Sequence, residues 1–140
     1  YILPSDKRQR FMQLPGSRLG LFNYDNVYLK TGVTFIVKGE IPAMLMHQLG
    51  FQVCAPTGGE GSGRRQAFRW NTALALSSIV VIGDNDAPGK ALAQKRADLF
   101  GAMLVFPPER YKDVDEWILD EEHVAVNQIR AWREQAKNLY

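Results

Sequence analysis

The chain has 140 residues, of which 46% are hydrophobic and 23% are charged, the balance of an ordinary soluble globular protein. That length suffices for one compact domain with a sizeable core, and no apolar run approaches the length that spans a bilayer. Cys54 is the single cysteine, which excludes an internal disulfide and a zinc site built from several thiolates.

The net charge of +2 conceals an uneven distribution along the chain. Residues 1–38 carry six Lys/Arg and two Asp, whereas residues 39–140 carry eleven Lys/Arg and thirteen Asp/Glu. A basic beginning joined to an acidic remainder suits a polyanion that approaches through metal ions. A solvated basic arm gives the same pattern, so charge alone leaves both interpretations open.

The first part of the chain predicts a helix between two strands. Residues 1–32 are rich in Pro, Gly, Asn and Asp, which favours short strands and loops. A continuous apolar, β-branched run follows at residues 33–37, as in a strand buried on both faces. Residues 42–50 predict a helix, because proline is tolerated in a first helical turn and Gly50 stands where a cap would end it. Residues 51–55 predict a second strand.

The middle of the chain continues the alternation of strands and helices. A glycine-rich loop is expected over residues 56–63, followed by a helix over residues 64–76. The apolar run at residues 78–83 predicts a third buried strand. A helix is expected over residues 87–101, with a glycine as its stop, and a fourth strand over residues 102–106, which two prolines end.

Two closing helices, over residues 113–122 and 123–140, complete the pattern. In the second, apolar side chains fall on one stripe, formed by Ala125, Ile129, Trp132 and Ala136. Strands that alternate with helices through short links predict an α/β fold with right-handed crossovers. We expect a four-stranded, mainly parallel sheet flanked by helices, with ligands beyond the carboxyl ends of its strands.

Two carboxylates, Asp84 and Asp86, come directly after the third strand. Residues i and i+2 of an extended segment point the same way, so both carboxylates can face one crevice. A divalent cation would relieve their repulsion, and ligands that offer only oxygen favour Mg²⁺ or Mn²⁺ over zinc. The alternative is that Asp84 begins a turn and Asp86 caps the helix at residue 87. The position after a fully apolar strand favours the metal interpretation.

Asp113 and Asp115 repeat this spacing after the fourth strand. Their alternative is also helix capping, with Asp113 as the N-cap and Glu116 completing a capping box. If both carboxylate pairs converge, the site can hold two cations, as sites of phosphoryl transfer often do. The glycine-rich loop could present N–H groups to phosphates, but no Gly-Lys-Ser/Thr follows, and a flexible surface loop is the simpler explanation.

The other residues of reactive type are assigned to structural positions. His47 and His123 share no metal-ligand spacing, and each is expected on the surface of a helix. Met44 and Met46 are expected to pack in or near the core. Cys54 falls in a predicted buried strand, where an inert thiol is expected.

Three segments, in order, resemble the motifs of the TOPRIM domain, which DnaG-type primases, topoisomerases and some small nucleases share. They are TFIVKGEIPAMLMHQLGF (34–51), IVVIGDNDAPGKALAQKRADLF (79–100) and YKDVDEW (111–117). The stretch FMQLPGSRLGLFN (11–23) is similar to the segment that leads into the catalytic domain of bacterial and bacteriophage primases. The resemblance covers about residues 10–120 and implies a Rossmann-like TOPRIM fold with Mg²⁺-dependent chemistry on nucleic acid.

The resemblance implies the catalytic core of a DNA primase, which makes RNA primers on a single-stranded DNA template from nucleoside triphosphates. Asp84 and Asp86 would hold Mg²⁺ or Mn²⁺, and Asp113 and Asp115 would support a second ion. Basic side chains would follow the template phosphates, namely Lys7, Arg8, Arg10, Arg18, Lys30, Arg64, Arg65 and Lys112. A replicative helicase is a candidate partner, no membrane is expected, and the expected location is the cytoplasm of a bacterial or phage-infected cell.

One motif departs from the family pattern. Where the family has a glutamate after the first strand and an aspartate four residues later, this chain has Lys38 and Pro42. A lysine cannot act as a carboxylate ligand, although its ammonium could itself lie between the acidic groups. Glu40 could stand in for the glutamate, at a displacement of roughly 6–7 Å along an extended segment. The candidate catalytic residues are Asp84, Asp86, Glu40 and Lys38.

Lys38 leaves a second function open, a degenerate TOPRIM module that binds nucleic acid or a replication partner without catalysis. A TOPRIM nuclease is a third alternative, against which the primase-like segment before residue 33 argues. The expected division is a basic lead-in segment over residues 1–32, a TOPRIM domain over residues 33–122 and a C-terminal helix over residues 123–140.

Overall fold

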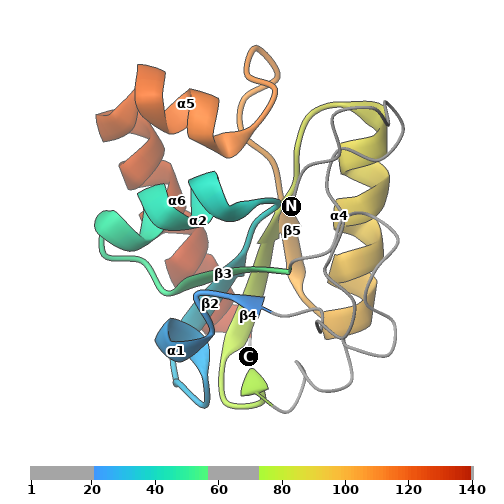
Figure 1. Cartoon of the computed structure of the whole chain (residues 1–140), viewed down its shortest axis with the longest axis vertical. Helices are drawn as coiled ribbons and strands as arrows, with labels where there is room; N and C mark the ends of the chain where they lie inside the picture. The colour runs from blue at the N-terminus through green and yellow to red at the C-terminus, as the bar shows by residue number, and fades with distance from the viewer. Residues whose placement is uncertain (1–20, 57–72, 140) are drawn as a thin grey trace, which may run out of the picture.

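The computed structural model describes residues 21–56 and 73–139. In these ranges a five-stranded sheet, ordered β1-β3-β2-β4-β5, lies between helices on both of its faces (Figure 1). The strands are β1 (Leu21–Phe22), β2 (Val33–Ile36), β3 (Val53–Pro56), β4 (Ser78–Ile82) and β5 (Met103–Val105). The helices are α1 (Tyr24–Val27), α2 (Glu40–Gln48), α4 (Ala87–Phe100), α5 (Val114–Asp120) and α6 (Glu122–Leu139).

The sheet is mainly parallel. β2 pairs in parallel with β3 and with β4, and β4 pairs in parallel with β5, whereas β1 pairs antiparallel with β3. The predicted α/β class is therefore confirmed, although the described sheet has five strands in place of the expected four. β1 falls in the N-terminal segment for which short strands and loops were expected, although its two residues are too few to mark its position by a periodicity.

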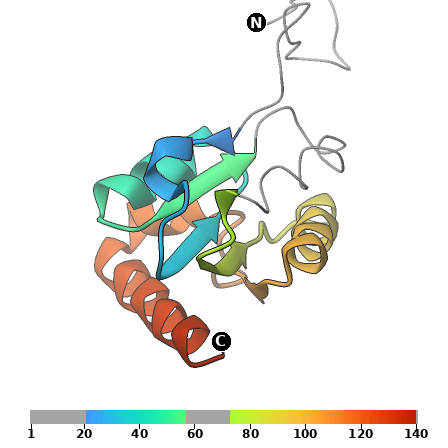
Figure 2. The same cartoon turned by 90° about the horizontal axis from the view of Figure 1, so that it is seen from below.

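Alternate residues of β2 face opposite sides of the sheet and belong to two separate cores. Val33 and Phe35 pack with residues of α2, α5 and α6, whereas Ile36 packs with residues of α4. Figure 2, turned by 90° from Figure 1, also shows α4 apart from α6, on the other side of the sheet. The apolar runs in the sequence are continuous because the central strands are buried on both faces.

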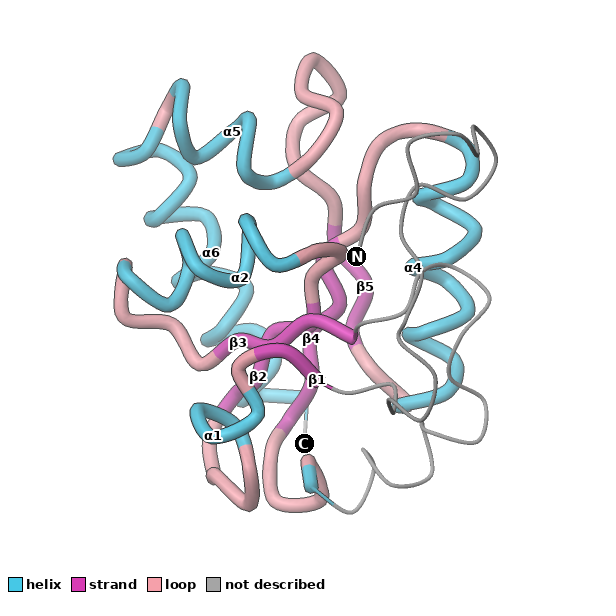
Figure 3. The backbone as a smooth tube through the Cα atoms, in the orientation of Figure 1, coloured by secondary structure: helices cyan, strands magenta, loops and turns pink. Residues whose placement is uncertain are grey.

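The loops that follow β2, β4 and β5 lie at the same edge of the sheet (Figure 3). From this edge α4 runs back along the sheet and ends before Gly101, whose φ of 59° matches the expected stop. In the same way Gly50, with a φ of 92°, follows the end of α2. The stripe expected on the last helix is confirmed, because α6 buries Ala125, Ile129, Trp132 and Ala136.

One expectation about local structure differs in its bounds and one is wrong. In the helix expected over residues 64–76, Ala73 is helical but residues 74–76 form a turn that leads into β4, and residues 64–72 lie outside the described part. Met44 is 50% exposed, because residues two apart on α2 point to nearly opposite sides and Met46 is the one that faces the core. Among residues 21–56 and 73–139, no helix is long and apolar enough to cross a membrane.

Candidate active site

The neighbouring strands β2 and β4 bring Lys38 next to Asp84. The two strands are paired in register up to Ile36 and Val81, so the residues that follow them reach the same edge of the sheet. The Nζ atom of Lys38 lies 3.9 Å from Oδ2 of Asp84, and the two side chains are 36% and 13% exposed. A cationic side chain therefore stands beside the first aspartate, where the TOPRIM resemblance implies a carboxylate.

Asp84 is the more buried aspartate of its pair, and burial raises the pKa of its carboxyl group. The charge of Lys38 opposes this and lowers the pKa, whereas the negative charges of Asp113 and Asp86 raise it further. Charged groups from the loops after β2, β4 and β5 thus all shift the pKa of this one carboxyl group. The raised pKa reflects burial first and the charges of Asp113 and Asp86 after it, and a cation beside this carboxylate would favour its charged form.

Asp86 caps α4, as the alternative interpretation of this pair predicted. Its Oδ1 accepts a hydrogen bond from the N–H of Gly89 at 2.7 Å. Its Oδ2 lies 4.0 Å from Nζ of Lys112, on the segment after β5. Capping leaves this second oxygen for a cation or a ligand, because a carboxylate has two acceptor oxygens.

The second aspartate pair also begins a helix. Oδ1 of Asp113 accepts the N–H of Glu116 at 3.0 Å, which confirms the predicted cap of α5. The Glu116 carboxylate accepts the N–H of Lys112 at 3.3 Å, one residue before the position that a capping box uses. Burial, a hydrogen bond with Asp113 and the negative charges of Asp113 and Asp84 raise the pKa of Asp115 to about 6. The two aspartate pairs therefore interact electrostatically across the edge of the sheet.

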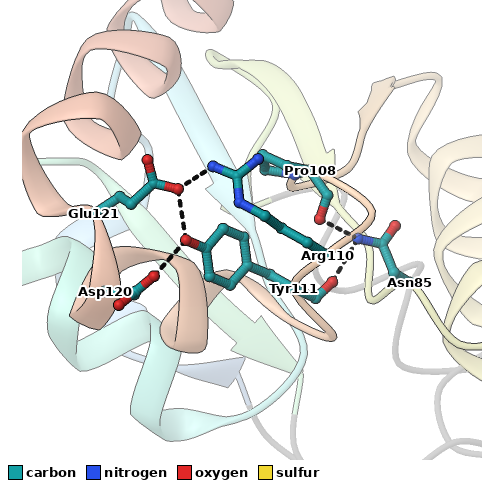
Figure 4. A network of polar contacts seen from close by, with 6 residues as sticks. All are labelled: Asn85, Pro108, Arg110, Tyr111, Asp120 and Glu121. Atoms are coloured by element: carbon teal, nitrogen blue, oxygen red, sulfur yellow. Dashed lines mark hydrogen bonds and ion pairs between the residues drawn. The ribbon is translucent and has the colours of Figure 1, made fainter.

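A polar network that sequence analysis missed fixes the segment between β5 and α5 (Figure 4). The hydroxyl of Tyr111 lies 2.5 Å from a carboxylate oxygen of Asp120 and 2.5 Å from one of Glu121, which together raise the pKa of Tyr111 to about 12. Arg110 forms an ion pair with the same Glu121 and lies over the Tyr111 ring at 4.9 Å from its centroid. On the other side of the segment, the Asn85 side chain donates hydrogen bonds to the backbone carbonyl oxygens of Pro108 and Tyr111.

The chemistry of the four aspartates fits Mg²⁺ or Mn²⁺, since carboxylate oxygens are the ligands that these hard cations prefer. Within residues 21–56 and 73–139, no three acidic, His or Cys side chains are close enough together to form a complete ligand set. Mg²⁺ does not need one, because it is usually bound through one or two carboxylates, several waters and the phosphates of a substrate. Asp84 and Asp86, with Asp113 and Asp115 beside them, are the residues that could hold the ion.

The other candidate residues make none of the contacts described so far. Glu40 is exposed at the first residue of α2, which follows β2 at the same edge of the sheet, and its charge is not among the causes that shift the pKa of Asp84. Lys30 precedes β2 and so lies at the opposite end of that strand from Lys38. The remaining basic candidates lie outside the described residues, namely Lys7, Arg8, Arg10, Arg18, Arg64 and Arg65.

The residues assigned to structural positions behave mostly as expected. His47 and His123 are exposed, and each contacts an asparagine side chain. Cys54 is buried, and burial raises the pKa of its thiol to about 12, which leaves it protonated and unreactive at neutral pH. None of these three side chains takes part in the candidate site.

The chain was also compared with known proteins. No family model and no solved structure matches it. Among curated proteins it is similar to the Twinkle homolog protein, chloroplastic/mitochondrial, of Arabidopsis thaliana, with 29% identity over 135 residues. The similarity covers 79% of this chain and 19% of that protein, so the chain spans about a fifth of the length of this relative. This finding is consistent with the relationship to primase-like TOPRIM proteins that the three sequence motifs predict.

Proposed function

We propose that this chain is the TOPRIM core of a DNA primase, which synthesises RNA primers on a single-stranded DNA template with the help of Mg²⁺ or Mn²⁺. The observation that carries the proposal is the meeting of two aspartate pairs at one edge of the sheet. Burial and the charges of Asp113 and Asp86 raise the pKa of Asp84 there, so the pairs act on one another. The similarity to the Twinkle homolog protein supports a role in DNA replication.

Asp84 and Asp86 would hold the ion, and Asp113 and Asp115 would support it from the segment after β5. When bound, the ion supplies positive charge that orients the triphosphate of a nucleotide and the 3′ hydroxyl of the primer. The Lys112 side chain, 67% exposed beside Asp86, would contact a phosphate group of the template or nucleotide. The helix caps keep Asp86 and Asp113 oriented before any ion or nucleotide arrives.

A second candidate is a module that binds nucleic acid or a replication partner without catalysis. The contact of 3.9 Å between Lys38 and Asp84 favours it, because an ammonium group can take the place of a cation beside this carboxylate. An ammonium group can attract phosphate but offers no site at which a metal could be bound. Binding of single-stranded DNA by such a module would survive removal of divalent metals.

The test is primer synthesis on a single-stranded DNA template, measured by the incorporation of labelled ribonucleotides. We expect activity in the wild type with Mg²⁺ and a fall to background in Asp84→Ala/Asp86→Ala. Asp98→Ala is the matched control, because Asp98 is an exposed aspartate of α4 that contacts only Gln94 among the hydrogen bonds of the described residues. Activity that persists in the double variant would exclude these aspartates from catalysis.

Lys38→Glu separates the two candidate functions in the same assay. A wild type that binds DNA but makes no primer, together with a gain of synthesis in Lys38→Glu, would establish the non-catalytic module. Loss of synthesis in Lys38→Glu would show that the lysine takes part in the primase reaction. Cleavage of labelled DNA under the same conditions would instead indicate a nuclease.

Partners and compartment belong to the same proposal. Single-stranded DNA and nucleoside triphosphates are the expected ligands, and a replicative helicase is the expected protein partner. A cytoplasmic location in a bacterial or phage-infected cell stays a prediction, because the name of the Arabidopsis relative refers to chloroplasts and mitochondria.

A further inference from the structure

Asn85, which separates the two aspartates after β4, binds the segment that leads to the second aspartate pair. Its Nδ2 lies 3.0 Å from the carbonyl oxygen of Pro107, 3.0 Å from that of Pro108 and 2.7 Å from that of Tyr111. Its backbone N–H donates to the carbonyl oxygen of Lys112 at 2.7 Å. Figure 4 shows the amide nitrogen pointing at this segment. One residue therefore provides four contacts to residues 107–112.

The segment needs these donors because of its own sequence. Pro107 and Pro108 carry no N–H group, so the chain cannot continue β5 as a hydrogen-bonded strand there. Their carbonyl oxygens still require partners, because a buried carbonyl group without one has lost its hydrogen bond to water and gained nothing in return. Pro107 is buried, which makes water a poor substitute for the Asn85 amide. An aspartate of the same shape would offer only acceptors to these carbonyl oxygens.

The opposite side of the segment is held as well. The Tyr111 side chain, 6% exposed, contacts Asp120 and Glu121 at the end of α5 through its hydroxyl group. The N–H of Tyr111 donates to the carbonyl oxygen of Pro108 at 2.9 Å, which closes a tight turn within the segment. The segment is thus fixed between the end of β4 and the end of α5, immediately before Lys112.

We propose that Asn85 is a positioning residue of the candidate active site. By fixing residues 107–112, it sets where Lys112, Asp113 and Asp115 stand relative to Asp84 and Asp86. The inference rests on the proposed function, because the distance between the two aspartate pairs affects a reaction only where a metal ion or a phosphate binds between them. The middle residue of the Asp-Asn-Asp sequence then has a role distinct from that of its neighbours, since it organises the site through the backbone of another segment.

The experiment compares Asn85→Ala with Asn26→Ala in the 140-residue chain. Asn26 is a matched control, because its Oδ1 accepts the N–H of Val53 at 3.0 Å, at the opposite edge of the sheet. Both variants lose a bond between an asparagine side chain and the backbone, and both are expected to lower the melting temperature. Mn²⁺ affinity is measured by calorimetry. The exchange of the Tyr111 and Glu116 amide hydrogens, which report on the turn and on the Asp113 cap, is measured by NMR.

We expect Asn85→Ala to weaken Mn²⁺ binding by about 10–100-fold, the usual effect of removing a group that orients metal ligands, and to accelerate exchange at both amides. Asn26→Ala should change neither readout. Equal Mn²⁺ affinity in Asn85→Ala and wild type, or an equal loss in Asn26→Ala, would overturn the proposal. If the wild type itself binds no Mn²⁺, the proposed metal site fails, and the role of Asn85 is then tested by amide exchange alone. Unchanged exchange of the Tyr111 and Glu116 amides in Asn85→Ala would overturn the proposal, whereas faster exchange than in Asn26→Ala would support it.

Discussion

Replacing Gly89 by alanine is expected to disturb the first aspartate pair through one added carbon atom. A Cβ at this position would lie 2.6 Å from Cβ of Asp84, 2.6 Å from Oδ1 of Asp86 and 3.2 Å from the carbonyl oxygen of Asp84. The first two distances are well inside van der Waals contact. The Cβ of Asp84 is attached directly to the backbone and cannot rotate away, so the segment that carries both aspartates must move.

Two opposing contributions determine the sign of the stability change. Alanine in place of glycine within a helix stabilises by about 1 kcal/mol. Forcing a methyl group into an occupied space costs about 1–3 kcal/mol, and loss of the Asp86 cap costs about 1 kcal/mol more. We therefore expect Gly89→Ala to lower the free energy of unfolding by about 1–3 kcal/mol, although the substitution improves helix propensity.

The assay is urea unfolding combined with Mn²⁺ calorimetry, and Gly101→Ala is the control. Gly101 has a φ of 59°, and a Cβ there would meet no heavy atom within 4 Å. Gly101→Ala should therefore lose about 1–2 kcal/mol to left-handed backbone strain while its Mn²⁺ affinity stays unchanged. Gly89→Ala should lose both stability and affinity. A Gly89→Ala chain as stable as wild type, or more so, would refute the argument from the crowded aspartate pair.

Three further predictions concern charge. Glu121→Gln should lower the melting temperature at neutral pH, because hydrogen bonds from Tyr111 and Arg110 lower the pKa of Glu121 and so stabilise its charged form. That contribution disappears as pH falls through the lowered pKa, so a difference that persists in acid would contradict it. Lys112→Ala should reduce the salt slope of single-stranded DNA binding by about 0.7, measured by fluorescence anisotropy. Lys38→Glu should raise the Mn²⁺ bound per chain, by calorimetry, from about one ion to about two, and an unchanged stoichiometry would count against it.

The central sheet could be predicted because its strands are buried on both faces. Phe35 and Val80 belong to continuous apolar runs, which local sequence distinguishes from amphipathic helices. β1 could not be predicted in this way, since its two residues hold their place by antiparallel pairing with β3. That pairing is a tertiary contact across more than 30 residues, with Leu21 opposite Pro56.

In the candidate site, the spacing of the acidic residues is visible in the sequence, whereas their partners are not. Asp84 and Asp86 stand out because two carboxylates at positions i and i+2 directly follow a fully apolar strand, where both can face one crevice. The contact of Lys38 with Asp84 depends on β2 lying beside β4, which is known only from the strand order. The role of Asn85 likewise depends on a segment 22 residues away passing beside it. Local sequence patterns thus identify the candidate ligands. The fold is needed to identify Asn85, which positions them, and Lys38, which offsets their charge.

The charges gathered at the edge of the sheet indicate why Lys38 matters more than any other departure from the TOPRIM pattern. At their formal charges, the four aspartates and the two lysines Lys38 and Lys112 carry a net charge of −2 (−4 and +2), which one divalent cation neutralises. With glutamate at position 38, the same groups would carry −4 (−5 and +1), which calls for two such ions.

Lys38 therefore replaces the charge of one divalent ion while it leaves all four aspartates in place. A single ion is enough to join carboxylates to a phosphate group, whereas clamping both the attacking and the leaving oxygen in a displacement takes two. The Lys38 ammonium is a point charge that can attract a phosphate, but it cannot accept an oxygen ligand as a metal does. For the proposed primase reaction we therefore expect one ion and one lysine at this site, and a binding module is the alternative if that combination does not support synthesis.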